Sequence, residues 1–143
     1  MQLVLDTDVV VAALRSERGA SRQLLLAAFD RRIVLLASVP LVIEYEAVLK
    51  RPQHLAAIGL AVDEIDVVLD ALAAVLEPIR LAFLWRPSLM DANDEMVLET
   101  AVNGAADRIV TFNVRHFVQA AKHFGLKVST PGETWRKVEE TKS

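Results

Sequence analysis

Short apolar runs alternate with longer amphipathic segments along the whole chain. The short runs are bounded by Gly, Pro and polar residues, which predicts strands at residues 3–5, 33–36, 79–81, 108–111 and 126–128. The longer segments carry apolar residues at helical spacing, which predicts helices at residues 9–16, 20–31, about 39–50, 63–76, 91–103 and 114–124. Strands that alternate with helices predict an α/β fold with a mainly parallel central sheet flanked by helices, in three layers (α/β/α).

The organisation predicted for the chain is one domain. Its 143 residues suffice for one core, and they contain no internal repeat, low-complexity segment or linker. Residues 1–136 are assigned to the domain, and residues 137–143 to a charged C-terminal tail that is expected to fray.

The composition is rich in apolar residues, at 53%, with a mean hydropathy of +0.33. Either this excess forms an Ala/Val/Leu-rich core, or part of it covers a surface for self-association or a partner. The second reading predicts a homodimer, with contacts from helix 63–76 and charge substitutions at Leu72 or Leu76 as its test.

Cysteine content and charge exclude several kinds of function. The chain has no cysteine, which rules out disulfides and thiolate metal sites. A net charge of −3 argues against a broadly basic nucleic-acid-binding surface but allows a local one. No basic leader precedes the first apolar run, and no apolar run could cross a bilayer, so a cytoplasmic protein without a membrane role is expected.

Three acidic positions are candidates for chemistry. Asp6 follows the first apolar run, and ligands of parallel sheets bind at the carboxyl ends of strands, although a capping turn explains the pair Asp6 and Asp8 equally well. Glu44 shares a helical stripe with apolar neighbours, where a carboxylate is costly unless it is paired or binds a cation. Asp94 lies in the first turn of its helix, where capping with Asp91 is a sufficient structural explanation.

A hydroxyl and an amide follow the fourth predicted strand. If this strand is parallel to the first, Thr111 and Asn113 come to the same edge of the sheet as Asp6. Thr and Asn at such a turn are equally good helix caps.

Together these segments resemble the PIN-domain family, and are most similar to its VapC-like toxin components of toxin–antitoxin systems. The resemblance rests on Asp6 in Val-Leu-Asp-Thr-Asp-Val and on Glu44 ahead of Ala-Val-Leu-Lys-Arg-Pro. It rests also on Asp94 in Asp-Ala-Asn-Asp-Glu-Met-Val-Leu-Glu and on Arg-Ile-Val-Thr-Phe-Asn-Val-Arg-His-Phe at 108–117. The four motifs occur in the family's order, from residue 1 to about 135.

The resemblance implies a ribonuclease that depends on Mg²⁺ or Mn²⁺, held by Asp6, Glu44 and Asp94 as the catalytic acids. Carboxylate oxygens suit these ions, which activate water and neutralise charge on the phosphate. It further implies an RNA substrate and a cognate antitoxin protein as partner. Arg51, Arg115 and His116 are candidate phosphate contacts, and His116 stands where the family often has an acid.

Asn113 departs from the family pattern, which often has an acid at this position. An amide keeps a carbonyl oxygen but loses the negative charge, so a second metal is expected to bind more weakly. Asp91 and Asp8 are candidates to compensate, and Thr111 is a candidate to orient a water molecule.

Two other readings remain open. Because of Asn113, the fold could serve as a binding module for RNA or a protein, with weak catalysis or none. The opening Asp-Thr-Asp-Val also resembles haloacid dehalogenase phosphatases, in which Asp6 would be the nucleophile and Asp8 the general acid. That family needs a catalytic lysine, and no lysine occupies the required middle region.

Overall fold

The computed structural model describes residues 1–82 and 91–141. Within them, five parallel strands form one sheet in the order β3-β2-β1-β4-β5. The strands are β1 (Gln2–Leu5), β2 (Val34–Ala37), β3 (Glu77–Pro78), β4 (Arg108–Val110) and β5 (Lys127–Ser129). The helices are α1 (Thr7–Arg15), α2 (Ala20–Phe29), α3 (Val39–Leu49), α4 (Pro52–Ile58), α5 (Val62–Val75), α6 (Ala92–Asn103), α7 (Val114–His123) and α8 (Pro131–Glu140).

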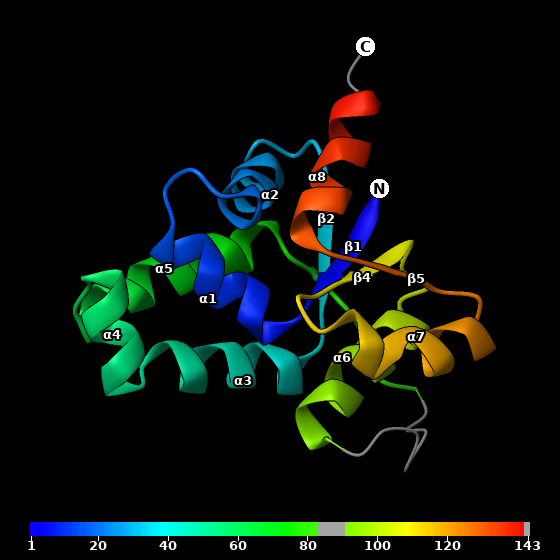
Figure 1. Cartoon of the computed structure of the whole chain (residues 1–143). Coiled ribbons are helices and arrows are strands. Elements are labelled where there is room, and N and C mark those ends of the chain that lie inside the picture. The colour runs from blue at the N-terminus through cyan, green and yellow to red at the C-terminus, as the bar shows by residue number, and fades with distance from the viewer. Residues whose placement is uncertain (83–90, 142–143) are drawn as a thin grey trace.

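Helices lie on both sides of this sheet, with α2 and α8 on one side and α6 on the other (Figure 1). This confirms the α/β class and the three-layer arrangement. The central strand β1 is buried on both faces, with Leu3 and Val4 at 0% exposure, as expected for a strand inside a parallel sheet. Its register with β4 pairs Leu5 with Val110, so the residues that follow both strands emerge at one edge.

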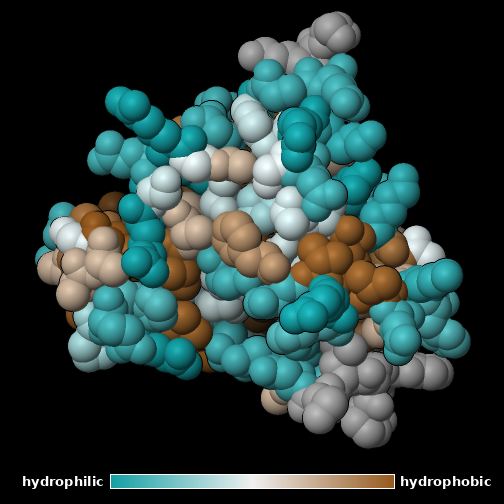
Figure 2. Space-filling model, viewed as in Figure 1, coloured by the Kyte–Doolittle hydropathy of each residue, from teal (hydrophilic) through white to brown (hydrophobic). Residues whose placement is uncertain are grey.

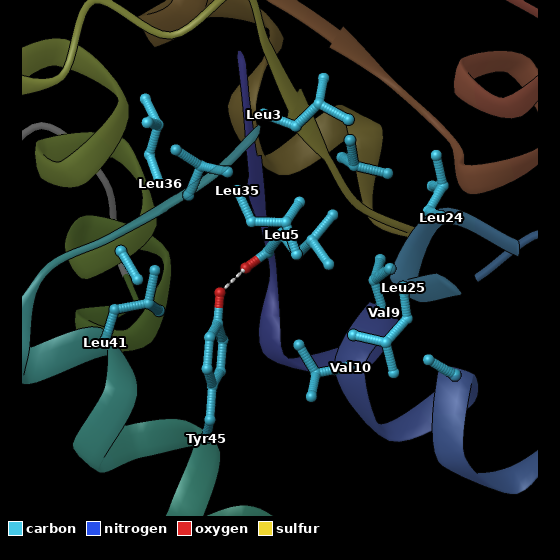
Figure 3. Packing of buried hydrophobic residues seen from close by; sticks show 14 of the residues in the cluster. Leu3, Leu5, Val9, Val10, Leu24, Leu25, Leu35, Leu36, Leu41 and Tyr45 are labelled. Carbon is cyan, nitrogen blue, oxygen red and sulfur yellow. Dashed lines mark hydrogen bonds between the residues drawn. The ribbon is translucent and has the colours of Figure 1, made fainter. Parts of the chain in front are cut away.

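Tyr45 joins α3 to the end of β1. Its ring is buried among the leucines of β1, β2 and α3, and its hydroxyl donates a hydrogen bond to the carbonyl oxygen of Leu5 (Figure 3). Burial raises the pKa of Tyr45 far above its usual value, with a smaller contribution from Asp6, so the hydroxyl keeps its proton. The contact fixes the helix that carries Glu44 against the strand that precedes Asp6.

Replacing Tyr45 by Phe should therefore destabilise the protein by about 1–2 kcal/mol, because a buried carbonyl loses its donor while the ring still fills its space. Urea unfolding measures the change. A free energy of unfolding equal to that of the wild type would show that the hydrogen bond contributes nothing.

Two elements differ from their predicted positions. The strand expected at 79–81 lies at Glu77–Pro78 instead, where Leu36 pairs with Glu77 and Ala37 with Pro78. Pro78 cannot donate to a ladder but is tolerated because β3 is an edge strand. Helix α1 begins at Thr7 rather than at residue 9, because Asp6 caps it.

Two helices were not predicted. Pro52 was interpreted only as the end of the preceding helix, but it also occupies the first turn of α4, which ends at Gly59 in a left-handed conformation with φ of 81°. Helix α8 reaches Glu140, so the expectation of a fraying tail was wrong for residues 137–140. Val138 is 3% exposed and anchors this helix in the core, while residues 142–143 lie outside the described residues.

Candidate active site

A cavity of about 540 Å³ opens at the carboxyl edge of the sheet. Residues of α1, α3, α4, α6 and the start of α7 line it, together with the residues that precede α1 and α6. It brings together most of the polar residues singled out from the sequence: Asp6, Asp8, Glu44, Arg51, Asp91, Asp94, Asn113 and His116. Segments up to about a hundred residues apart thus share one site, as ligand-binding sites of parallel sheets do.

Asp6 is both a cap and a site residue, which resolves the two readings left open by the sequence. One carboxylate oxygen accepts a hydrogen bond from the backbone N–H of Thr7 at 2.8 Å, and the other accepts one from the Thr111 hydroxyl at 2.7 Å. Burial raises the pKa of Asp6, and the charge of Asp91 adds to the rise. The hydrogen bonds from Thr111 and Thr7 oppose it.

Thr111 is fully buried, and its hydroxyl has two partners. It donates to Asp6 and accepts from the backbone N–H of Asn113 at 2.9 Å. The hydroxyl orients the Asp6 carboxylate, and its predicted role in orienting a water molecule stays a prediction.

Asp8 lies in the first turn of α1, with one oxygen satisfied and one left over. Oδ2 accepts from the backbone N–H of Phe112 and from the side-chain amide of Asn113, each at 3.2 Å. Oδ1 is buried and has no hydrogen-bond partner among the described residues. Burial, followed by the charge of Asp6, raises the pKa of Asp8 to about 7.

Asn113 presents its amide nitrogen, rather than its carbonyl oxygen, to the acids. The side chain donates to Asp8, although its carbonyl was expected to serve as a metal ligand. A carboxylate at this position would repel Asp8, whereas the amide stabilises it. The loss of charge at Asn113 is therefore accompanied by a donor that keeps Asp8 in place.

Asp91 and Asp94 divide two roles at the start of α6. Asp91 is exposed and caps the helix by accepting from the backbone N–H of Asn93 at 2.8 Å. Asp94 is free of capping and accepts from Nδ1 of His116 at 3.1 Å. Burial raises the pKa of Asp94, with further contributions from the charges of Asp6 and Asp91, while His116 lowers it. Asp94 thus reaches into the site, as predicted, with an imidazole holding one oxygen.

Glu44 and two of the three predicted phosphate contacts line the cavity, and the third contact does not. Glu44 is half-buried on α3 and lines the cavity next to the anchored Tyr45. Arg51 also lines it, and His116 does so while bonded to Asp94. Arg115 is exposed and does not line the cavity.

The donor set suits a hard divalent cation. Within residues 1–82 and 91–141, no three acidic or histidine side chains lie close enough together to coordinate one metal ion. Mg²⁺ does not need such a cage, because it commonly binds one or two carboxylates and completes its shell with water and substrate phosphate. The unpartnered oxygen of Asp8 and the raised pKa values of three acids, all relieved by a cation, fit such an ion.

Several cavity residues were missed in the sequence. Arg15, Ser16 and His54 line the side of the cavity formed by α1 and α4. Helix α4 itself was not expected, so nothing placed His54 near the first strand. A Pro one residue after Arg51 was the available signal, since Pro favours the first turn of a helix.

A family model described as the PIN domain matches residues 2–115. The chain belongs to the PIN-domain family. The PIN fold also agrees with a solved structure, the crystal structure of VapBC2 from Rickettsia felis bound to a DNA fragment from their promoter. That chain superimposes with a TM-score of 0.61 at 18% identity, over 91% of this chain and 98% of the other. No curated protein sequence gives a significant match.

PIN-family membership removes the phosphatase reading. In addition, the described residues that line the cavity include no lysine, which a phosphatase of that kind needs. Separately, none of the described helices is both long and apolar enough to span a membrane.

Proposed function

We propose that this PIN-domain protein is a divalent-metal-dependent endoribonuclease, acting in the cytoplasm as the toxin of a toxin–antitoxin pair. The observation that carries the proposal is the convergence of Asp6, Asp8, Glu44, Asp91 and Asp94 on one cavity at the carboxyl edge of the sheet. Burial is the main cause of the raised pKa values of Asp6, Asp8 and Asp94, and repulsion from neighbouring carboxylates adds to the rise. A bound cation offsets this repulsion and attracts a phosphodiester.

One or two carboxylates for each ion, from among Asp6, Glu44 and Asp94 with Asp91 or Asp8 as further candidates, would hold Mg²⁺ or Mn²⁺, and water and substrate phosphate would complete the shell. When bound, the ion supplies a more acidic water and neutralises charge on the phosphate. The protein's own groups set the positions: Thr111 orients Asp6, Asn113 holds Asp8, and His116 holds Asp94. The cavity of about 540 Å³ leaves space for the RNA backbone beside the acids.

The test is cleavage of a mixed cellular RNA pool with Mn²⁺, Mg²⁺ or chelator. We expect cutting by the wild type with either ion, none with chelator, and none by Asp94→Asn. Asp70→Asn, on the exposed side of α5, makes the same charge change outside the cavity and should cut normally. Equal inactivity of folded, antitoxin-free wild type and Asp94→Asn would contradict the proposal.

The alternative is a PIN-fold binding module with little catalysis, which Asn113 favours because it removes one acid from the site. Calorimetry separates the two functions. A catalytic site binds Mn²⁺ with measurable heat that Asp6→Asn abolishes, whereas a binding module gives no such heat but still binds RNA.

The antitoxin and homodimer proposals rest on the apolar surface and on the VapBC2 structure, which is a complex. Leu72 is 3% exposed, so a charge there would disrupt the core rather than test an interface. Val67 on the same helix is 68% exposed, and Val62 is 46% exposed. These two residues replace Leu72 as candidates for the contact.

If α5 forms the dimer contact, Val67→Lys should shift the protein from dimer to monomer in size-exclusion chromatography with light scattering. The exposed position predicts no change in the fold, which circular dichroism checks. A dimer that survives the Val62→Lys/Val67→Lys double substitution would exclude the exposed apolar residues of α5 as the contact.

A further inference from the structure

The cavity has two parts of opposite chemistry. One part contains the acids described above, at the ends of β1 and β4 and on α3 and α6. The other part lies between α1 and α4, where Val11, Ala12 and Val48 form an apolar wall and Arg15, Arg51 and His54 provide the polar groups. Figure 2 shows brown, hydrophobic surface between these helices, flanked by teal side chains. We call this part the α1–α4 recess.

The two arginines of the α1–α4 recess are available to a ligand. Within the part of the chain that the structure describes, neither Arg15 nor Arg51 has an ion-pair partner, although acids line the same cavity. The neighbouring Lys50, by contrast, is held by Glu46 at 3.1 Å and by Asp66 at 2.6 Å, outside the cavity.

Arg15 is not needed to complete its helix either. Arg22 already donates to the carbonyl oxygens of Ala13 and Leu14 at the end of α1. Two guanidinium groups facing one recess with no protein anion to bind are suited to an external anion, and guanidinium geometry matches phosphate.

We propose that the α1–α4 recess is a nucleotide subsite for single-stranded RNA, in which Arg15 and Arg51 bind the phosphate next to the scissile one. The apolar wall of Val11 and Val48 receives the base, and His54 offers its ring for stacking. This inference rests on the proposed ribonuclease function. It assigns to Arg15 and His54 a role in substrate binding, and to Arg51 a phosphate other than the one that is cut.

The cavity favours single-stranded RNA over other anions. Its 540 Å³ is within the range of roughly 300–1,000 Å³ that encloses a small ligand, so an unpaired nucleotide can enter but a duplex cannot. An acidic peptide would place further carboxylates beside the acidic part of the cavity, where they would be repelled. A phosphodiester chain can instead bind a cation in the acidic part and the two arginines in the α1–α4 recess. Basic groups beside a ring on which a base can stack, here the arginines and His54, are also the usual combination in sites for single strands.

The experiment measures binding of a fluorescein-labelled, random-sequence RNA of about eight nucleotides by anisotropy, with Ca²⁺ and with a gel to show that the RNA stays intact. Arg15→Gln and Arg51→Gln should each weaken binding on the order of tenfold, the loss of one charge-assisted contact. Each should also reduce the slope of log Kd against log salt by about 0.7. Arg18→Gln is the matched control, because Arg18 is exposed, three residues from Arg15, and absent from the cavity lining.

Equal losses in Arg18→Gln and the two recess variants would overturn the subsite, since they would report only net charge. So would unchanged RNA binding, an RNA that does not bind the wild type, or an Asp/Glu-rich peptide that loses affinity in the recess variants while RNA does not. Cleavage of the cellular RNA pool is scored separately. If the wild type cleaves RNA and the recess variants bind RNA as well as it does, the subsite proposal alone is wrong. If RNA binding depends on the two arginines but the wild type does not cleave RNA, the nuclease proposal alone is wrong.

Discussion

Replacing Asp6 by Asn should lower RNA cleavage on the order of a thousandfold while leaving the protein at least as stable at pH 8. Asn keeps an oxygen that can accept from the backbone N–H of Thr7, so the cap of α1 survives, and its amide nitrogen can donate to the Thr111 hydroxyl, which is able to accept. The substitution removes a carboxyl group whose pKa is raised mainly by burial, which means that the fold disfavours its ionised form. Function and stability should therefore move in different directions.

The comparison with Asp6→Ala makes this result specific. Alanine removes both the charge and the cap, so it should be inactive and also less stable by about 1 kcal/mol. Initial cleavage rates and urea unfolding at pH 8 provide the two measurements. An active Asp6→Asn would exclude a charge requirement at Asp6, and a clear loss of stability in that variant would show that the carboxylate is structural.

The positions of Asp6, Thr111 and Asn113 could be predicted because they depend on local order along the chain. A short apolar run followed by polar residues marks the end of a buried parallel strand, and the last residues of β1 and β4 both show it. Once two such strands are neighbours, their ends meet at one edge whatever the intervening sequence is. This is why the acidic part of the cavity followed from the sequence while much of its remaining wall did not.

The sequence analysis missed helices α4 and α8, because the residues at their ends are compatible with more than one local structure. Pro52 ends one helix and begins the next, and only the first meaning was recognised. Charged residues near the C-terminus indicated a tail, yet Thr130 and Glu133 form a reciprocal capping box that starts α8. The short sequence pattern Thr-x-x-Glu was the available signal, and the buried Val138 is what keeps the charged helix on the domain.

The direction of a side chain could not be predicted at all. The sequence showed that Asn113 lacks a charge, but not that its amide nitrogen reaches Asp8 across more than a hundred residues. That contact exists only because β1 and β4 are paired. Asp8 thus lies in the cavity with the other acids and is held there by Asn113, and its raised pKa leads to an expected dependence on pH.

The protein without metal should lose stability as the pH rises from about 4 to 7. In the unfolded chain Asp8 ionises near its ordinary pKa of about 3.9, whereas burial and Asp6 raise its folded pKa to about 7. Between these values the folded state holds the proton that the unfolded state has lost, so the free energy of unfolding falls with pH and levels off above 7. Because Asp8 is partly exposed, we discount its share to about 1–2 kcal/mol.

Asp8→Asn should flatten this pH dependence and raise stability at pH 8, and Asp70→Asn should do neither. Added Mn²⁺ should act in the opposite sense, because the ion competes with protons for the same oxygens and stabilises only the folded state. Its stabilising effect should thus grow from pH 5.5 to 8, as measured by urea unfolding with and without the ion. A metal effect independent of pH would mean that Mn²⁺ binds away from the acids with raised pKa values, and the acidic part of the cavity would no longer be the site of catalysis.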